Sequence, residues 1–215
     1  MRVGGETVKE SPCVKNLGVL FDRHLSWDAH VSDVIRKSIG LLIGLRHLRH
    51  FLPRHAILSI VKGLVISRVR YCISVYGDGS AANHDKLLKV INFAARVVTG
   101  IKKYDHISRA RDALGLHTPR MMCDLQTASV AHKAIAVGVP DSLAELFHTY
   151  AAARDCGRST RQDRLLRPPG VRTAAGQRAF AYRAATLLNE MPEDVRSRTP
   201  STFKLAAKRF LTDVT

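Results

Sequence analysis

The sequence has few acidic residues for its size. Its 215 residues include 18 Asp and Glu but 34 Lys and Arg, which gives a formal net charge of +16 and a pI near 10.3. Such an imbalance destabilises a compact chain through self-repulsion unless a polyanion offsets it. The composition therefore predicts RNA, DNA or an RNA:DNA hybrid as the partner, bound through its phosphate backbone.

Long apolar runs and clustered cysteines are also missing. The longest apolar run, residues 39–45, falls far short of the roughly 20 residues that span a bilayer, and residues 1–10 lack the apolar core of a secretory signal. The four cysteines are dispersed with no C-x-x-C pair, which argues against a disulfide framework and a zinc knuckle. We expect a protein that is neither secreted nor membrane-spanning, located in the cytoplasm, the nucleus or both, with no metal and no cofactor.

The hydrophobic content of 46% is enough for a real core, and its spacing is mostly helical. Residues 6–9 and 14–21 are of β type and predict a small hairpin. Ser26 is expected to cap the first of several helices, and the second is expected to be buried on most of its circumference. The helical segments are predicted over residues 26–52, 53–71, 83–100, 107–114, 119–135, 180–188 and 203–211. We therefore predict a mainly α fold, a helical bundle with a small N-terminal β-hairpin.

A series of short motifs runs along most of the chain. Its segments are residues 14–22, 25–27 with His30, 45–46, 52–53, 69–72, 87–96, 114–116, 119–120, 140–147, 176–180, 188–192 and 202–204. The order of these motifs resembles the end of the polymerase domain in non-LTR (LINE-type) retrotransposons of the jockey and CR1-like groups, where the chain leaves the palm for the thumb. One segment departs from the family pattern, because Ile91 stands where relatives often have Gln.

The resemblance implies a catalytically incomplete piece of a reverse transcriptase. In the family, the aromatic-x-Asp-Asp motif that binds two metal ions belongs to the palm, and this sequence contains no Asp-Asp pair. Two-metal nucleotidyl transfer requires clustered carboxylates, so we expect no polymerase activity, and the palm and fingers are a possible partner. The implied organisation is a palm-edge hairpin remnant at 1–25, a helical thumb-like bundle at 26–148, an Arg-rich loop at 149–170 and a helical tail at 171–215.

Basic residues gather in two parts of the chain. Between residues 31 and 70 there are eight Lys and Arg and one acid, and between residues 154 and 183 there are eight Arg and two acids. Arg49 falls within the apolar sector of its helix, so we expect it to snorkel or pair rather than contact a ligand. Residues 149–169 have few apolar side chains and are expected to be mobile without a partner. The predicted nucleic-acid-binding residues are Arg36, Lys37, Arg46, Lys62, Arg158, Arg161 and Arg164.

Other interpretations remain open. A basic helical protein-interaction module, a small enzyme of another class, and a non-functional, decayed transposon copy are all compatible with the composition. His47, His50 and His55 lie close in sequence, but a solvated basic face is favoured over a metal site because arginines surround them. Trp27 is better explained as a core anchor than as a base-stacking residue. An interaction module should have a neutral apolar groove, whereas a thumb-like region should bind nucleic acid with a steep salt dependence.

Overall fold

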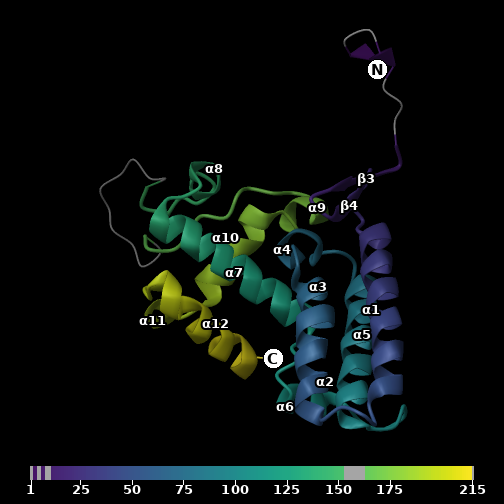
Figure 1. Cartoon of the computed structure of the whole chain (residues 1–215). Coiled ribbons are helices and arrows are strands. Elements are labelled where there is room, and N and C mark those ends of the chain that lie inside the picture. The colour runs from purple at the N-terminus through teal and green to yellow at the C-terminus, as the bar shows by residue number, and fades with distance from the viewer. Residues whose placement is uncertain (1, 4–5, 8–10, 153–162, 215) are drawn as a thin grey trace. The chain divides into compact units, whose positions relative to one another are not determined.

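The structure is a computed structural model, and it describes residues 2–3, 6–7, 11–152 and 163–214. The described chain is mainly helical and has two small antiparallel β-hairpins at its N-terminal end (Figure 1). The predicted fold class is therefore confirmed. The chain forms two compact units, Met1–Cys72 with Gly79–Pro119 and Ile73–Asp78 with Arg120–Thr215. Within the described ranges, no helix is long and apolar enough to cross a membrane.

The β-type run at residues 14–21 forms a hairpin by itself. Strand β3 (Cys13–Asn16) pairs with β4 (Val19–Asp22), and a separate hairpin joins β1 (Arg2–Val3) to β2 (Glu6–Thr7). Both residues of the β3–β4 turn have positive φ, 45° at Leu17 and 87° at Gly18. Two-residue turns of this kind match the twist of the flanking strands. The sequence prediction did not place this turn, because Leu17 is a poor turn residue.

Asp22, rather than Ser26, organises the start of the first helix, α1 (Asp28–Leu48). The Asp22 carboxylate accepts hydrogen bonds from the backbone N–H groups of His24, Ser26 and Trp27 at 3.0, 3.0 and 2.8 Å, and from the Ser26 hydroxyl at 3.2 Å. These bonds, led by the one from the Ser26 backbone, lower the pKa of Asp22. The helix begins one residue later than the predicted Ser26 cap implies, because Trp27 is the N-cap residue. Ser26 still contributes, since its Oγ accepts a hydrogen bond from Asp28 N at 3.4 Å.

Three helical rods form the first unit. They are α1, a continuous helix made of α2 (Arg54–Ile60), the π-helical segment η1 (Val61–Ile66) and α3 (Ser67–Arg70), and then α5 (Ala81–Thr99). Asn83 Nδ2 donates to Ser26 O at 3.2 Å at one end, whereas Arg49 lies against Gly100 at the other. Helices α1 and α5 therefore run parallel, and the middle rod runs antiparallel to both (Figure 1).

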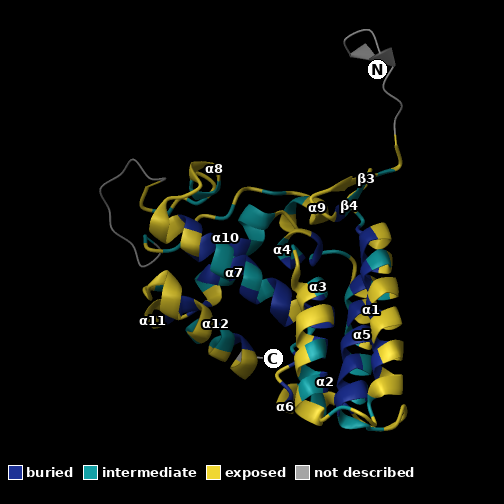
Figure 2. Ribbon diagram, viewed as in Figure 1, coloured by how far each residue is buried: buried dark blue, intermediate teal, exposed yellow. Residues whose placement is uncertain are grey.

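The core of the first unit lies between these rods. Leu42, Val61, Val69, Ile91 and Ala94 are fully buried, and the outer side of α1 is exposed (Figure 2). The middle rod buries only one face, so its predicted burial on most of the circumference is wrong. The reason is that only two rods pack against it, which leaves Leu64 49% exposed. The short helix α6 (Ser108–Ala113) follows as predicted, with Ile107, Leu114 and Leu116 buried at its ends.

The second unit is built on α7 (Pro119–Val137). Its other helices are α4 (Ile73–Tyr76), α8 (Asp141–Ala144), α9 (Ala174–Gln177), α10 (Phe180–Glu190), α11 (Glu193–Arg196) and α12 (Pro200–Val214). Met121, Leu125 and Ala128 of α7 share one core with Leu188 and Phe203. The predicted bundle at 26–148 is therefore divided at Pro119–Arg120, because the apolar face of α7 is buried by helices later in the chain.

The predicted Arg-rich loop is anchored at both ends. Thr149 and Leu166 form an isolated β-bridge, and Leu166 belongs to the core of the second unit. The Asn189 side chain donates to Leu166 O at 2.8 Å and accepts from Leu166 N at 2.9 Å. Residues 153–162 lie outside the described residues. Leu166 therefore has partners for both its side chain and its backbone, and the mobility expected of residues 149–169 stays a prediction.

Candidate nucleic-acid interface

Arg46 is the predicted residue that the structure places in a basic cavity. The cavity lies at the C-terminal ends of α1 and α5, within the first unit, and has a volume of about 580 Å³. Five of its lining residues are cationic, and among its described lining residues none is acidic. The cavity, called the basic cavity below, is lined by Arg46, Arg49, Phe93, Arg96, Val97, Gly100, Ile101, Lys102 and Lys103.

Two of the cavity arginines are held in place by the backbone after α5. Arg96 donates from Nε to Lys102 O at 3.3 Å and from Nη2 to Asp105 O at 3.2 Å. Arg49 lies over Gly100, because a Cβ at that position would be 2.7 Å from its Nη2 atom. Gly100 ends α5 with a φ of 81°, a conformation that glycine adopts without strain. Arg49 and Arg96 are both half-buried, and the two hydrogen bonds of Arg96 position its guanidinium before any ligand arrives.

The electrostatics of the basic cavity favour an anion. Each helix carries a partial negative charge at its C-terminus, which stabilises nearby cations by roughly 0.3–1 kcal/mol each. Five cations carry far more positive charge than the partial negative charges of two helix ends can offset. They therefore also repel one another. A phosphate has the charge to offset that repulsion, and the planar guanidinium groups can donate two parallel hydrogen bonds to it.

No known protein family, curated protein or solved structure matches this chain.

Sequence reasoning missed most of this cavity. Arg49 was expected to avoid a ligand, yet it lines the cavity beside Arg46, and Arg96, Lys102 and Lys103 were not singled out. Arg49 is half-buried as its position in the apolar sector predicts, but it is buried against a glycine at the cavity wall. A cation in the last turn of α5, followed by Gly100 and two lysines, was the signal available in the sequence.

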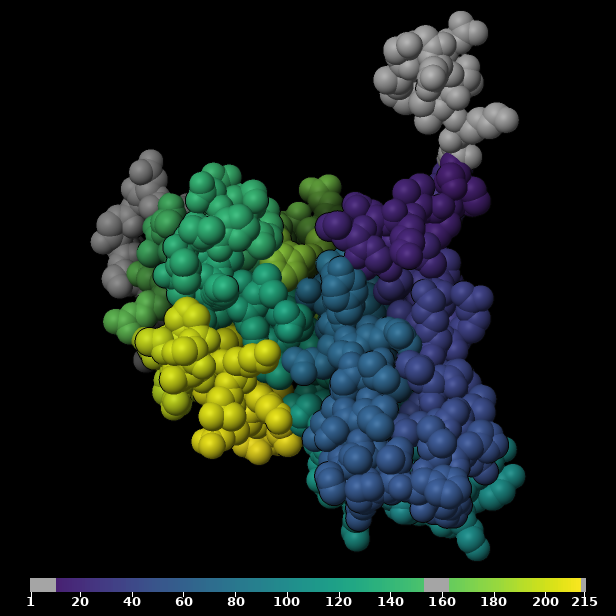
Figure 3. Space-filling model, in the orientation of Figure 1, coloured from purple at the N-terminus to yellow at the C-terminus, as the bar shows by residue number. Residues whose placement is uncertain are grey.

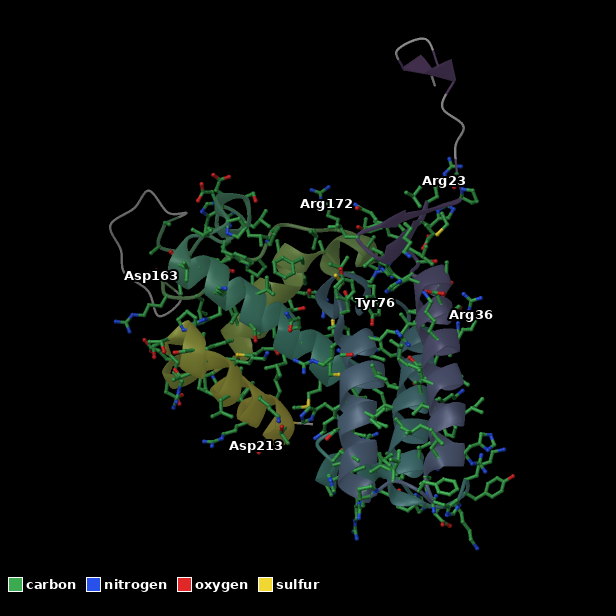
Figure 4. All side chains as sticks on the ribbon, viewed as in Figure 1. Arg23, Arg36, Tyr76, Asp163, Arg172 and Asp213 are labelled. Carbon is green, nitrogen blue, oxygen red and sulfur yellow. The ribbon has the colours of Figure 1, made fainter. Side chains whose placement is uncertain are left out.

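Arg36 and Lys37 share one carboxylate on the outer side of α1. Arg36 Nη2 lies 2.8 Å from Asp33 Oδ1, and Lys37 Nζ lies 2.6 Å from Asp33 Oδ2. The hydrogen bond from Lys37 is the main reason that the pKa of Asp33 is lowered. Arg36 points away from the bundle (Figure 4), with 79% of its side chain exposed. Both cations remain accessible, but Asp33 offsets part of their charge.

Lys62 stands apart from the basic cavity. It is exposed on η1, and its Nζ lies 3.9 Å from the position a Cβ would take at Gly115. The structure therefore does not bring Lys62 to Arg46, although both are on rods of the same unit. Lys62 remains a separate exposed cation near the loop that follows α6.

The predicted and neighbouring arginines of the second unit differ in whether the structure describes them and in how exposed they are. Arg158 and Arg161 lie outside the described residues. Arg164 is 79% exposed and forms an ion pair with Glu193, which is 60% exposed; such pairs contribute little to stability. Arg172 points away from the chain (Figure 4). Arg164 and Arg172 are thus accessible to a ligand.

Arg183 is structural, which corrects its place among the basic residues of 154–183. Its side chain is 13% exposed, and it lies 3.3 Å from a carboxylate oxygen of Asp78 and 3.3 Å from one of Asp124. Its Nη2 also donates to Cys123 Sγ at 3.2 Å. Burial raises the pKa of the Cys123 thiol, so this cysteine is not an activated nucleophile. The group joins the turn after α4 to α7 and α10, and its two carboxylates offset the charge of Arg183.

Trp27 is buried, and the three histidines are exposed, as the sequence predicts. Trp27 is 8% exposed and packs edge-to-face on Phe21, with ring centroids 5.2 Å apart, so it is a core anchor. His47, His50 and His55 are exposed around the ends of α1 and α2, as expected for a solvated basic face.

Proposed function

We propose that this protein binds nucleic acid through the phosphate backbone, without sequence preference and without polymerase activity of its own. The basic cavity carries the proposal, since it gathers five cations and no described acid at one end of a helical bundle. The resemblance to the thumb side of LINE-type reverse transcriptases points to the same ligand. The protein would be a fragment of such a polymerase, acting where its nucleic acid is, in the cytoplasm or the nucleus.

Contacts to phosphates explain why the binding should not depend on sequence. Hydrogen bonds to the backbone fix the position of a protein on a duplex but do not read the bases. A region that follows a growing duplex of changing sequence needs contacts of this kind. An RNA:DNA hybrid, with its A-like geometry, should therefore be bound at least as well as B-form DNA.

A second candidate function is supported by the outer side of α1. Leu41, Ile43 and Leu48 are 38%, 48% and 53% exposed, and a Cβ built at Gly40 or Gly44 would meet nothing within 4 Å. Leu41 and Leu48 are seven residues apart and lie on the same side of α1, and exposed apolar side chains of this kind suit a protein-interaction module. Binding by such a module would depend weakly on salt, whereas phosphate binding depends on it steeply.

A salt titration of binding to an RNA:DNA hybrid tests the proposal. The variant R46Q/K102Q/K103Q removes three exposed cavity cations, and the control K15Q/R172Q/K204Q removes three exposed cations elsewhere, so each lowers the net charge from +16 to +13. Each phosphate contact contributes roughly 0.7–0.9 to the slope of log affinity against log salt. We expect the cavity variant to lose a slope of about 2 and the control to lose much less.

The contribution of the Arg-rich segment is tested in parallel. The variant R158A/R161A/R164A should also lower the slope if those arginines contact phosphates. An unchanged slope would make the segment a solvated linker. A wild-type protein that shows no salt-dependent binding would refute the proposed function as a whole.

A further inference from the structure

Two aromatic rings project into solvent at the end of the bundle where the basic cavity lies. Tyr104 is 89% exposed and Phe51 is 83% exposed, among the most exposed large apolar side chains described. Phe51 lies in the turn between α1 and α2, and Tyr104 lies in the loop between α5 and α6. Arg49 lies against Gly100, so the two connections are close to each other at this point. In Figure 3 the chain after α5 (teal) projects beyond the ends of α1 and α2.

Each ring is close to a cation of the basic cavity, Phe51 in sequence and Tyr104 in space. Phe51 follows Arg49 by two residues, and Lys103 Nζ is 5.4 Å from the centroid of the Tyr104 ring. Residues 46–55 and 96–106 together contain six Lys and Arg and a single acid, Asp105. The end of the bundle therefore alternates positive charge with exposed π surface.

We propose that this end of the bundle binds a single-stranded stretch of nucleic acid, with phosphates at the basic cavity and bases stacked on Phe51 and Tyr104. The inference rests on the proposed function and specifies the form of nucleic acid that this site takes. Each nucleotide of a single strand offers one phosphate and one unpaired base. The phosphates match the cations of this end of the bundle, and the bases match its two exposed rings. Stacking on aromatic rings tolerates any sequence because every base has a π face.

A duplex does not use the rings in this way. Its bases are stacked on one another, so only its terminal pair could contact Phe51 or Tyr104, whereas its phosphates can still reach the cavity cations. An apolar protein partner also fits poorly, because the two rings are surrounded by positive charge. The rings therefore distinguish unpaired from paired nucleic acid, and the cations serve both.

Single-strand binding is tested with labelled oligo(U) and a blunt-ended RNA:DNA hybrid. The variant F51A/Y104A should bind oligo(U) about tenfold more weakly for each ring removed and bind the hybrid within about twofold of the wild type. The control V14A/L205A trims two other exposed apolar side chains, 56% and 58% exposed, and should bind both ligands normally. F51W/Y104W should retain oligo(U) binding because indole rings also stack on bases.

A fluorescence measurement reports stacking directly. The native Trp27 is 8% exposed and packs on Phe21, so oligo(U) should leave its emission nearly unchanged. The single variant F51W adds an exposed indole whose emission should be quenched as oligo(U) is added. Quenching by the blunt hybrid to the same extent would overturn the inference.

The outcomes separate this inference from the proposed function. If the hybrid binds with a steep salt slope but F51A/Y104A binds oligo(U) as well as the wild type does, only the single-strand inference fails. If neither ligand binds in a salt-dependent way, both fail.

Discussion

Removing Arg183 should destabilise the second unit, because this arginine is buried and pairs with two carboxylates. The side chain is 13% exposed and contacts Asp78, Asp124 and Cys123, which come from the chain after α4 and from α7. Arg183→Met keeps much of the aliphatic volume but leaves two carboxylates without their shared guanidinium. The expected result is a lower free energy of unfolding.

The size of the loss follows from burial. Breaking a fully buried ion pair costs roughly 3–5 kcal/mol, chiefly because the remaining charge is left uncompensated. Asp78 and Asp124 are 29% and 24% exposed, so water partly solvates them once Arg183 is gone. We therefore expect a loss of about 3 kcal/mol for Arg183→Met, near the lower end of the range. Asp124→Asn alone should cost about 1 kcal/mol, since Asp78 still pairs with Arg183.

The assay is urea denaturation at pH 7, followed by far-UV circular dichroism. Arg172→Met is the matched control, because Arg172 is exposed and its loss should change stability by less than about 0.5 kcal/mol. The triple variant R183M/D78N/D124N should recover at least half of the loss, since it removes the charges of the two carboxylates together with that of the arginine.

Two results would refute this reasoning. Arg183→Met could be as harmless as Arg172→Met, in which case the network contributes nothing. The triple variant could instead be less stable than Arg183→Met, in which case the guanidinium acts through packing rather than through charge.

Two further predictions concern Gly100 and His30 of the first unit, and Gly138 of the second unit is the control for Gly100. Gly100→Ala and Gly138→Ala place alanine at φ values of 81° and 70°, so each should lower the free energy of unfolding by about 1 kcal/mol. Only Gly100→Ala should also lower the salt slope of hybrid binding, because its Cβ would displace Arg49. A Cβ at Gly138 would meet nothing within 4 Å. Equal effects of the two on binding would contradict the role of Arg49. Burial lowers the pKa of His30 below its ordinary 6.5, so the unfolded chain takes up a proton first and stability should fall as the pH drops from 7 to 5, by at most about 1.4 kcal/mol per pH unit. His30→Gln should reduce this loss in urea denaturation at the two pH values, and an unchanged loss would show that His30 is not its source.

Most helices could be predicted because their signals are local. Apolar side chains every three or four residues, Pro53 and Pro119 at helix starts and Gly100 at a helix end predicted the rods of the first unit and α7. The errors were also local in origin. The turn at Leu17 and Gly18 lacks a strong turn residue at its first position. The N-cap of α1 is Trp27, one residue after the predicted Ser26, and a tryptophan gives no capping signal in the sequence.

The candidate site could be predicted only in part. Composition predicts the positive charge of the first unit, and a helical wheel predicts that Arg46 is accessible to a ligand. The wheel also placed Arg49 on the apolar side, but it could not show that the partner there is Gly100, about fifty residues later in the chain. The same limit applies to Arg183, which looks like any other arginine of a basic run until α4 and α7 place Asp78 and Asp124 beside it.

The sequence by itself determined where the chain is helical and that its charge is strongly positive, because helix formation depends on neighbours within one or two turns and charge depends only on composition. The tertiary structure decided which cations gather in the basic cavity, which arginine is buried with two carboxylates, and that α7 packs with later helices rather than earlier ones. These outcomes depend on contacts between residues tens of positions apart. Such contacts form only when the apolar faces of different helices pack against one another in the folded core.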